Sequence, residues 1–181
     1  MISYISILRG INVSGKKLIK MNALEAVYEQ LGFLDVITYV QSGNVVFCSE
    51  IDDSNEIEQL IKSKIKEVFD FDVPVIVLTK DELEEIVADN PFTKDSSKNT
   101  EFLHFTFLQA RPDYSSIESI ANKRQEGEDI AFSNNVVYLY CPLGYGNTKL
   151  TTNLLENLLK VEATTRNYNT TMALLKLASI K

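Results

Sequence analysis

The chain has 181 residues, of which 45% are hydrophobic, and its formal net charge is −7. This length allows one large domain or two small ones, and the acidic balance argues against broad nucleic-acid binding, which needs a basic face. No run approaches the ~20 consecutive apolar residues of a membrane span, and no basic signal-peptide region precedes the first apolar run. We therefore expect a cytosolic protein with no membrane partner.

Few residues could bind a metal or act as a nucleophile. Cys48 and Cys141 lie at the ends of apolar runs, which predicts buried, reduced thiols and no disulfide framework. His104 is the single histidine, and no metal-ligand spacing surrounds it. The sequence thus predicts no metal site and no cofactor, and it identifies no catalytic residue.

Hydrophobic periodicity and capping patterns define the elements of the first half. In chain order they are a strand at residues 2–8, a helix from Asn22 to Gly32 with the capping box Asn22-x-x-Glu25, strands at 36–40 and 44–48 around the turn Gln41–Gly43, a helix that begins with Asp53-x-x-Glu56, and a strand at 73–78. The order of elements is therefore βαββαβ.

Thr79-x-x-Glu82 then predicts a short capped helix, which Pro91 stops. Residues 93–100 are polar throughout, which is typical of a flexible loop or a domain boundary. The second half repeats the order of the first. Its elements are a strand at 102–108, a helix at 112–121, strands at 129–132 and 135–141, a helix at 150–159, an extended piece at 164–166, and a final helix with Met172, Leu175 and Ala178 facing inward.

The two halves also show local sequence similarity, because Ser42–Phe47 resembles Ser133–Tyr138. Together with the repeated order, this predicts an α+β fold of duplicated ferredoxin-like βαββαβ units with mainly antiparallel sheets. We expect a first unit at residues 1–78, a connecting helix and polar loop at 79–100, and a second unit with a C-terminal helix at 101–181.

A basic loop bracketed by glycines follows the first strand. Gly10-x-x-x-x-Gly15-Lys16-Lys17 nearly matches the phosphate-binding P-loop, but Lys17 stands where that motif needs Ser or Thr for Mg²⁺. The pattern also fits a looser anion site made of Arg9, Lys16 and Lys17, because strand–loop–helix segments often bind anions. The alternative is a solvated connection with glycines at positive φ.

In a βαββαβ unit the first and third strands are antiparallel neighbours, so the basic loop and the Gln41–Asn44 turn should meet at one edge. The N-terminus of the first helix should point to the same place and add about half a positive charge. Asn12, Ser42 and Asn44 could then orient a ligand through hydrogen bonds. The simpler interpretation is that Ser42 and Asn44 only shape a turn.

The segment 164–171 is dense in polar groups in the second half. Arg166 could hold an anion through two parallel hydrogen bonds, with Asn167 beside it. Alternatively, Asn167 caps the last helix and Arg166 pairs with an acidic neighbour.

Several motifs in this order resemble a bacterial family known as domain of unknown function 1697. They are Arg9-Gly10-Ile11-Asn12-Val13, Met21-x-x-Leu24, Tyr39-x-Gln41-Ser42-Gly43-Asn44-Val45-Val46-Phe47, Lys149-Leu150, and Thr164-Thr165-Arg166-Asn167-x-Asn169-Thr170. The resemblance implies a tandem ferredoxin-like fold and no established activity. Ser14 and Tyr168 depart from the family pattern, which usually has Gly and Trp there.

Three functions fit these patterns. The first is binding of a small anionic ligand, such as a phosphate-bearing metabolite, a nucleotide or a short nucleic-acid segment, at Arg9, Asn12, Lys16, Lys17, Ser42, Asn44, Arg166 and Asn167. The second is an enzyme that acts on a phosphorylated or carboxylated substrate. The third is a protein-interaction scaffold whose motifs serve only turns and caps.

Overall fold

The computed structural model describes residues 1–180. Its strands and α-helices are, in chain order, β1 (Ile2–Leu8), α1 (Met21–Gln30), β2 (Leu34–Tyr39), β3 (Asn44–Ser49), α2 (Ser54–Phe69), β4 (Val75–Thr79), α3 (Lys80–Ala88), β5 (Leu103–Leu108), α4 (Ile117–Ala121), β6 (Asp129–Phe132), β7 (Val136–Tyr140), α5 (Thr152–Leu159), β8 (Ala163–Asn167) and α6 (Tyr168–Ala178). The 3₁₀ turns are η1 (Pro91–Lys94), η2 (Thr100–Phe102), η3 (Tyr114–Ser116) and η4 (Tyr145–Asn147). No helix of the described residues is long and apolar enough to cross a membrane.

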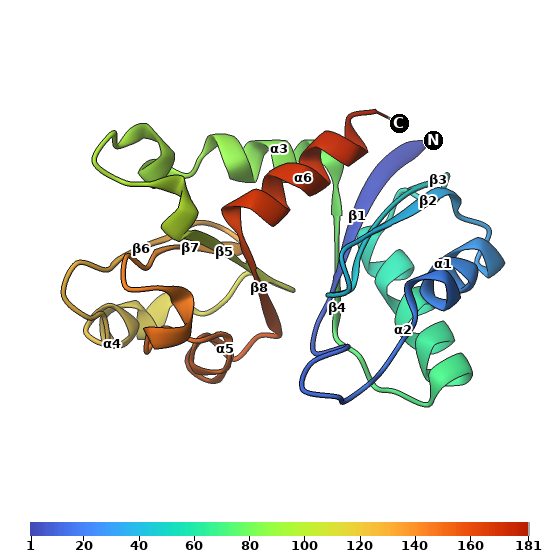
Figure 1. The fold of residues 1–181 in the computed structure, drawn as a ribbon, viewed down its shortest axis with the longest axis horizontal. Helices are drawn as coiled ribbons and strands as arrows, with labels where there is room; N and C mark the ends of the chain where they lie inside the picture. The colour runs from blue at the N-terminus through green and yellow to red at the C-terminus, as the bar shows by residue number, and fades with distance from the viewer. Residues whose placement is uncertain (181) are drawn as a thin grey trace. The chain divides into compact units, whose positions relative to one another are not determined.

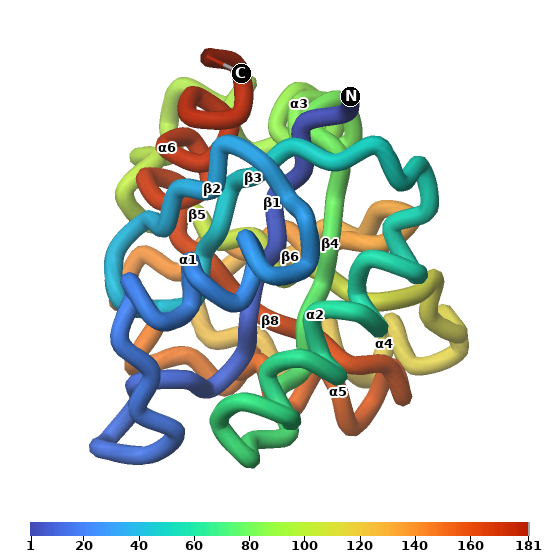
Figure 2. Tube along the Cα trace, turned by 90° about the vertical axis from the view of Figure 1, so that its right-hand side faces the viewer, coloured from blue at the N-terminus to red at the C-terminus, as the bar shows by residue number. Residues whose placement is uncertain are grey.

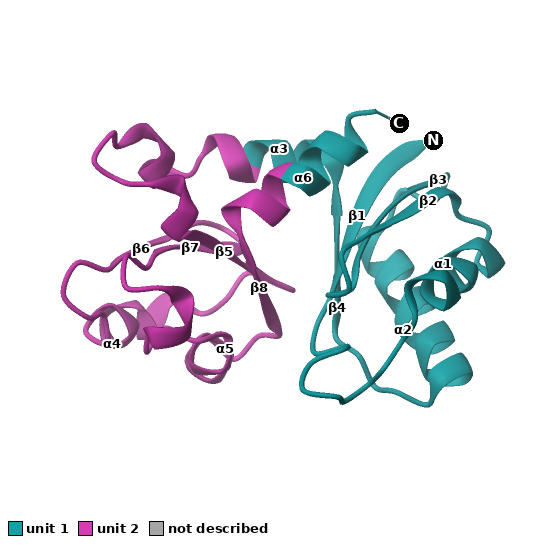
Figure 3. Cartoon of the chain, viewed as in Figure 1, with its two compact units in different colours: residues 1–85, 173–181 teal, residues 86–172 magenta. Residues whose placement is uncertain are grey.

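The chain forms two compact units, one made of Met1–Glu85 with the chain from Ala173 onward, the other of Ile86–Met172 (Figure 3). Each unit holds a four-stranded sheet, with the order β2-β3-β1-β4 in the first and β6-β7-β5-β8 in the second (Figure 1). All neighbouring strands are antiparallel. The duplicated ferredoxin-like fold predicted from the sequence is confirmed.

The core of the first unit lies between one face of its sheet and the helices α1 and α2 (Figure 1). Aromatic rings fill its centre, with Phe33 stacked on Phe47 at 4.7 Å between ring centroids. One hydroxyl pair crosses the core, because Ser6 Oγ and Tyr28 OH lie 2.6 Å apart. Burial raises the pKa of Tyr28, so its hydroxyl stays protonated and this polar pair is satisfied inside the core.

The second unit has a matching core between its sheet and the helices α4 and α5, which contains Leu108, Ile120, Leu155 and Leu159. A hydroxyl pair again sits in the first strand of the unit, where Thr106 Oγ1 lies 2.8 Å from Thr165 Oγ1. The two units thus repeat the element order, and each has a hydroxyl pair on its first strand, although the partner comes from α1 in the first unit and from β8 in the second.

The structural alignment of the two units is shifted by one residue from the alignment that their sequence similarity suggests. The Leu8 N–H donates to Gly43 O at 2.8 Å, and in the second unit the Leu108 N–H donates to Asn135 O at 2.8 Å. Gly43 therefore corresponds to Asn135 and not to Asn134. A shift of one residue along a strand inverts its faces, so pairing Ser42–Phe47 with Ser133–Tyr138 was wrong in register although the repeat is real.

Helix caps follow the sequence patterns in most places. Asp53 accepts hydrogen bonds from Asn55 N and Glu56 N at the start of α2. Thr79 and Glu82 form the reciprocal capping box predicted for α3.

The capping box predicted for α1 at Asn22 is wrong. The N-cap of α1 is Lys20, which forms no side-chain capping hydrogen bond. Glu25, the other half of the predicted box, accepts hydrogen bonds from Thr38 N and Thr38 Oγ1 instead. A carboxylate with a partner on β2 is not available to cap its own helix. The prediction failed because the pattern is local and the competing partner is thirteen residues away.

Lys98 holds the polar stretch between α3 and β5. Its ammonium lies 2.6 Å from Asp129 Oδ2 and 3.6 Å from Asp95 Oδ2. It also lies 4.6 Å from the centroid of the Tyr140 ring and 5.7 Å from that of Phe92. The pKa of Lys98 is raised, mainly by its hydrogen bond to Asp129. One cation therefore connects this stretch to β6 and β7.

Cys48 and Cys141 are both buried, and neither forms a disulfide within the described residues, as the sequence predicted. Burial raises the pKa of the Cys141 thiol from 9.0 to about 11, with a smaller contribution from the Glu128 carboxylate. A thiol in this environment is a weak nucleophile at neutral pH. The structure thus favours a packing role for Cys141.

Replacing Gly43 with Ala should destabilise the protein strongly. A Cβ at this residue would lie 2.7 Å from Leu8 Cβ and 2.9 Å from Ile11 Cδ1, and its φ is +76°. Gly10 is the matched control, because its φ is +72° and a Cβ added there would meet no heavy atom within 4 Å. Urea denaturation should show a loss of about 1 kcal/mol for Gly10→Ala from the backbone alone, and a further loss of about 1–3 kcal/mol for Gly43→Ala. Equal losses would contradict the close approach at Gly43.

The stability of the protein should fall as the pH rises from about 9 to about 11, partly because of Cys141. The pKa of this thiol is raised in the folded state, so its contribution is complete below the unfolded pKa and is lost as the pH passes the folded value. Cys141→Ala should remove up to about 2 kcal/mol of that fall. Urea denaturation at pH about 8 and about 10.5 measures it. An unchanged pH dependence would refute the assignment.

Candidate functional site

The basic loop between β1 and α1 folds as a miniature hairpin beyond the end of the sheet (Figure 2). Val13 and Lys16 form an isolated antiparallel bridge, and the Lys16 N–H donates to Val13 O at 2.9 Å. Ser14 and Gly15 between them have φ values of 50° and 73°. Two central residues at positive φ are the mark of a type I′ turn. The loop is therefore not wrapped as a P-loop.

The Asn12 carboxamide closes this loop. Its Oδ1 accepts a hydrogen bond from Ile19 N at 2.8 Å, and its Nδ2 donates to Ile19 O at 2.9 Å. The same Nδ2 donates to Gln41 O at 2.9 Å, in the turn between β2 and β3. The loop and the turn therefore meet, as the strand order predicted, and the Asn12 side chain is used in holding them together.

The turn residues also have structural partners. Asn44 is fully buried, and its Nδ2 donates to Tyr39 O at 3.1 Å and to Ser42 Oγ at 2.8 Å. These hydrogen bonds lie across the turn. They agree with the simpler interpretation, in which Ser42 and Asn44 shape the turn. Ser42 itself is exposed.

The cations of the loop have different surroundings. Lys17 Nζ donates a hydrogen bond to Asp72 O, in the connection between α2 and β4. Arg9 is half-buried at the end of β1, where its N–H donates to Pro74 O at 3.0 Å. Lys16 and Lys20 are exposed. The positive charge of this end is therefore most accessible at Lys16 and Lys20.

A hollow of ≈ 580 Å³ opens where the loop, the turn and the start of α1 meet. Its lining comprises Asn12, Leu18, Ile19, Lys20, Met21, Asn22 and Gln41. The first turn of α1 carries no acidic residue, and no side chain of the described residues caps it. Free N–H groups at a helix N-terminus, the helix dipole and a lysine together make an environment that favours an anion.

The sequence predicts a site at this end of the first unit, but the predicted site residues do not include Lys20, Asn22 and Gln41, which line the hollow. The pattern Asn22-x-x-Glu25 had placed Asn22 as the cap that would satisfy the helix N-terminus. Because the N-cap is Lys20, two residues before the predicted cap, Asn22 belongs to the first turn of α1 and lines the hollow.

The second unit gives an internal comparison. At the equivalent turn, Tyr114 OH donates to Asn134 O at 2.9 Å and also bonds to Ser133 O. Asp113 accepts a hydrogen bond from Ser115 N and so caps the helical segment. The hollow at this end measures ≈ 270 Å³ and is lined by Tyr114, Ile117, Phe132, Ser133 and Asn134. The tyrosine ring occupies space, and the Asp113 carboxylate already caps the 3₁₀ turn η3, so this end is poorly suited to an anion.

Arg166 and Asn167 lie in the second unit, on β8. Arg166 Nη1 donates to Thr164 Oγ1 at 3.0 Å and to Thr165 O at 2.9 Å, and burial lowers the pKa of its guanidinium to about 10. Asn167 Oδ1 accepts a hydrogen bond from Thr170 N at 2.8 Å, which caps α6. The capping role offered for Asn167 is confirmed.

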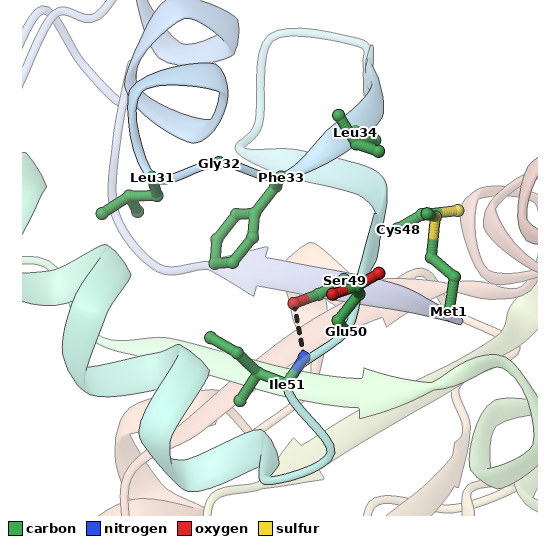
Figure 4. A pocket seen from close by; sticks show the side chains of 9 residues that line it. All are labelled: Met1, Leu31, Gly32, Phe33, Leu34, Cys48, Ser49, Glu50 and Ile51. Atoms are coloured by element: carbon green, nitrogen blue, oxygen red, sulfur yellow. Dashed lines mark hydrogen bonds between the residues drawn. The ribbon is translucent and has the colours of Figure 1, made fainter.

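Another hollow, of ≈ 340 Å³, lies at the far ends of β2 and β3 (Figure 4). Met1, Leu31, Phe33, Leu34 and Cys48 give it apolar walls, and the Ile51 N–H donates to Ser49 Oγ beside it. Among the side chains of the described residues that line it, Glu50 carries the charge, and no side chain is cationic. This hollow therefore does not suit an anion.

The described residues contain no cluster of three or more metal-ligating side chains. His104 stacks on Tyr145 at 4.7 Å between ring centroids, and burial lowers the pKa of its imidazole. It is therefore neutral at pH 7 and packs as an aromatic ring.

Fold and site together define a protein of two ferredoxin-like units, with a basic hollow at the loop end of the first. The chain belongs to the family described as protein of unknown function (DUF1697), whose model matches residues 1–138. Its fold is similar to that of the conserved bacterial protein SP0830 from Streptococcus pneumoniae, at 21% identity over 98% of each chain and a TM-score of 0.76. At that identity the likeness shows the fold alone. No curated protein matches the chain.

Asn12→Ala should destabilise the protein by about 1–3 kcal/mol, because Ile19 N, Ile19 O and Gln41 O all lose a partner. Alanine also tolerates the φ of 54° at this residue less well than asparagine does. Asn22→Ala is the matched control, because Asn22 is exposed in the same region, and it should change stability by less than about 0.5 kcal/mol. Urea denaturation compares the two, and similar losses would show that the Asn12 bonds do not hold the loop.

Proposed function

We propose that the protein binds a small anionic ligand, a phosphate-bearing or carboxylate metabolite, in the hollow at the N-terminus of α1. The observation that carries the proposal is the uncapped first turn of α1 beside Lys20. Helix α1 has 10 residues, long enough to present a full dipole at its N-terminus. Asn22 and Gln41 supply neutral hydrogen-bonding groups at the walls of the same hollow.

A comparison with the other helices supports the N-terminus of α1 as the binding site. Among the described α-helices of eight or more residues, α2, α3, α5 and α6 each receive a capping hydrogen bond from Asp53, Thr79, Thr151 and Asn167. A cap satisfies the N–H groups that an anion would otherwise bind. In the first turn of α1 the Ala23 N–H donates to Lys20 O at 3.0 Å, which leaves the N–H groups of Met21 and Asn22 for another partner.

The charge of the chain supports a small ligand. A net charge of −7 repels long polyanions, whereas a single phosphate or carboxylate responds mainly to the local groups around it. The described lining of the hollow includes Lys20 and no acidic side chain, so local charge rather than net charge decides what binds there.

Lys20→Gln should weaken the binding of inorganic phosphate by about 1.5–3 kcal/mol, because one charge-assisted contact is lost. Isothermal titration measures the affinity, and the backbone amide signals of Met21 and Asn22 should shift on binding. Lys123→Gln is the matched control, because Lys123 is an exposed lysine of the second unit. It should leave both the affinity and these signals unchanged.

Two results would overturn the proposal. One is the absence of any shift of the Met21 and Asn22 amides at phosphate concentrations that saturate weak sites. The other is an equal loss of affinity in Lys20→Gln and Lys123→Gln, which would indicate a general charge effect.

A further inference from the structure

We infer that the ligand of this hollow carries an apolar group next to its anionic group; the inference rests on the proposed function and adds the class of ligand. The first observation is the lining itself. Lys20, Asn22 and Gln41 are polar, while Leu18, Ile19 and Met21 supply apolar surface to the same hollow. Sites for small molecules commonly combine apolar walls with a few polar groups that fix orientation.

The second observation is the size of the hollow. A volume of ≈ 580 Å³ is within the range of about 300–1,000 Å³ that holds organic ligands of drug-like size. A bare inorganic anion at the helix N-terminus would leave most of this space to water. An organic body attached to the anion would instead cover the apolar wall.

The third observation is the apolar surface that this end exposes. Leu18 is 67% exposed, Val13 57% and Val40 53%. Val13 and Val40 are the chain neighbours of Asn12 and Gln41, which are hydrogen-bonded to each other, so both belong to the rim of the same end. Large apolar side chains gathered at one place on a surface indicate a binding site more often than scattered ones do.

The backbone at the turn gives an independent sign. Val40 has a φ of 50°, a conformation that a β-branched residue rarely adopts. Its side chain is exposed, so packing in the core does not explain why valine occupies this position. Strained residues of this kind concentrate at functional sites.

Among the described residues, the corresponding end of the second unit has no exposed apolar rim of this kind. At its equivalent hollow, Tyr114, Ile117 and Phe132 are half-buried rather than exposed. The exposed apolar rim is therefore particular to the first unit and is not a general property of the fold.

The test is a series of soluble phosphates of increasing apolar size: inorganic phosphate, ethyl phosphate, butyl phosphate and hexyl phosphate, with hexanol as the uncharged arm. Each methylene that is buried should improve the affinity by up to about fourfold. Isothermal titration gives the affinities, and the amide signals of Met21 and Asn22 locate the binding. Hexanol should bind far more weakly than hexyl phosphate.

Leu18→Ser should remove most of the gain in affinity along the alkyl series, measured relative to inorganic phosphate in the same variant. Leu143→Ser is the matched control, because Leu143 is a leucine of the second unit with 60% exposure. It should keep the full gain. Both substitutions are at exposed positions, so neither should compromise folding.

The outcomes separate the two proposals. If inorganic phosphate binds and the alkyl chains add nothing, the apolar part is refuted while the anion site stands. If neither phosphate nor any alkyl phosphate binds, both proposals fail. If the soluble series fails but vesicles of phosphatidylglycerol bind through Leu18 and Lys20, the surface contacts a membrane, and the inference of a small-molecule ligand is overturned.

Discussion

The carboxamide of Asn12 is the constraint on which the loop end of the first unit depends. The loop has little apolar packing of its own, since its tip is exposed and Ile11 and Ile19 alone enter the core. Asn12 fixes both the N–H and the C=O of Ile19, and α1 begins two residues later. The position of the helix N-terminus therefore follows from one side chain, and so does the shape of the hollow beside it.

The two units solve the same problem with different chemistry. Each must join the segment after its first strand to the turn between its second and third strands. The first unit uses the small Asn12 carboxamide, which bridges to Gln41 and leaves space, whereas the second uses the Tyr114 hydroxyl, whose ring fills that space. A duplicated fold can thus keep one open end and close the other without altering either sheet.

The fold could be predicted from the sequence because its signals are local and repeated. The hairpin around Gly43, the capping residues Asp53 and Thr79, and the apolar stripe of Ile57, Ile61 and Ile65 each act within a few residues. In the final helix the prediction was partly wrong, because Leu174 and not Leu175 is buried beside Ala178.

The location of the candidate site could be predicted from the sequence, but the roles of its residues could not. Strand order brought the loop and the turn together, but the roles of single residues depend on partners distant in sequence. Glu25 binds Thr38, Lys17 binds Asp72, and Asn12 binds Gln41, and no local pattern encodes these pairings. The same limit explains why the two units were aligned one residue out of register. Sequence similarity alone does not show which face of a strand is buried.

The contacts of Lys98 bear on how the protein resists proteolysis. A polar stretch of this composition would ordinarily be the first segment of the chain that a protease cleaves. The Lys98 side chain, which trypsin must accept into its specificity pocket to cleave after this residue, lies between two carboxylates and two aromatic rings, with 15% of the side chain exposed, whereas Lys94 in the same stretch is exposed. Cleavage after Lys98 therefore requires the segment to detach from β6 and β7 first, and its rate reports the local opening of the second unit rather than the accessibility of a loop.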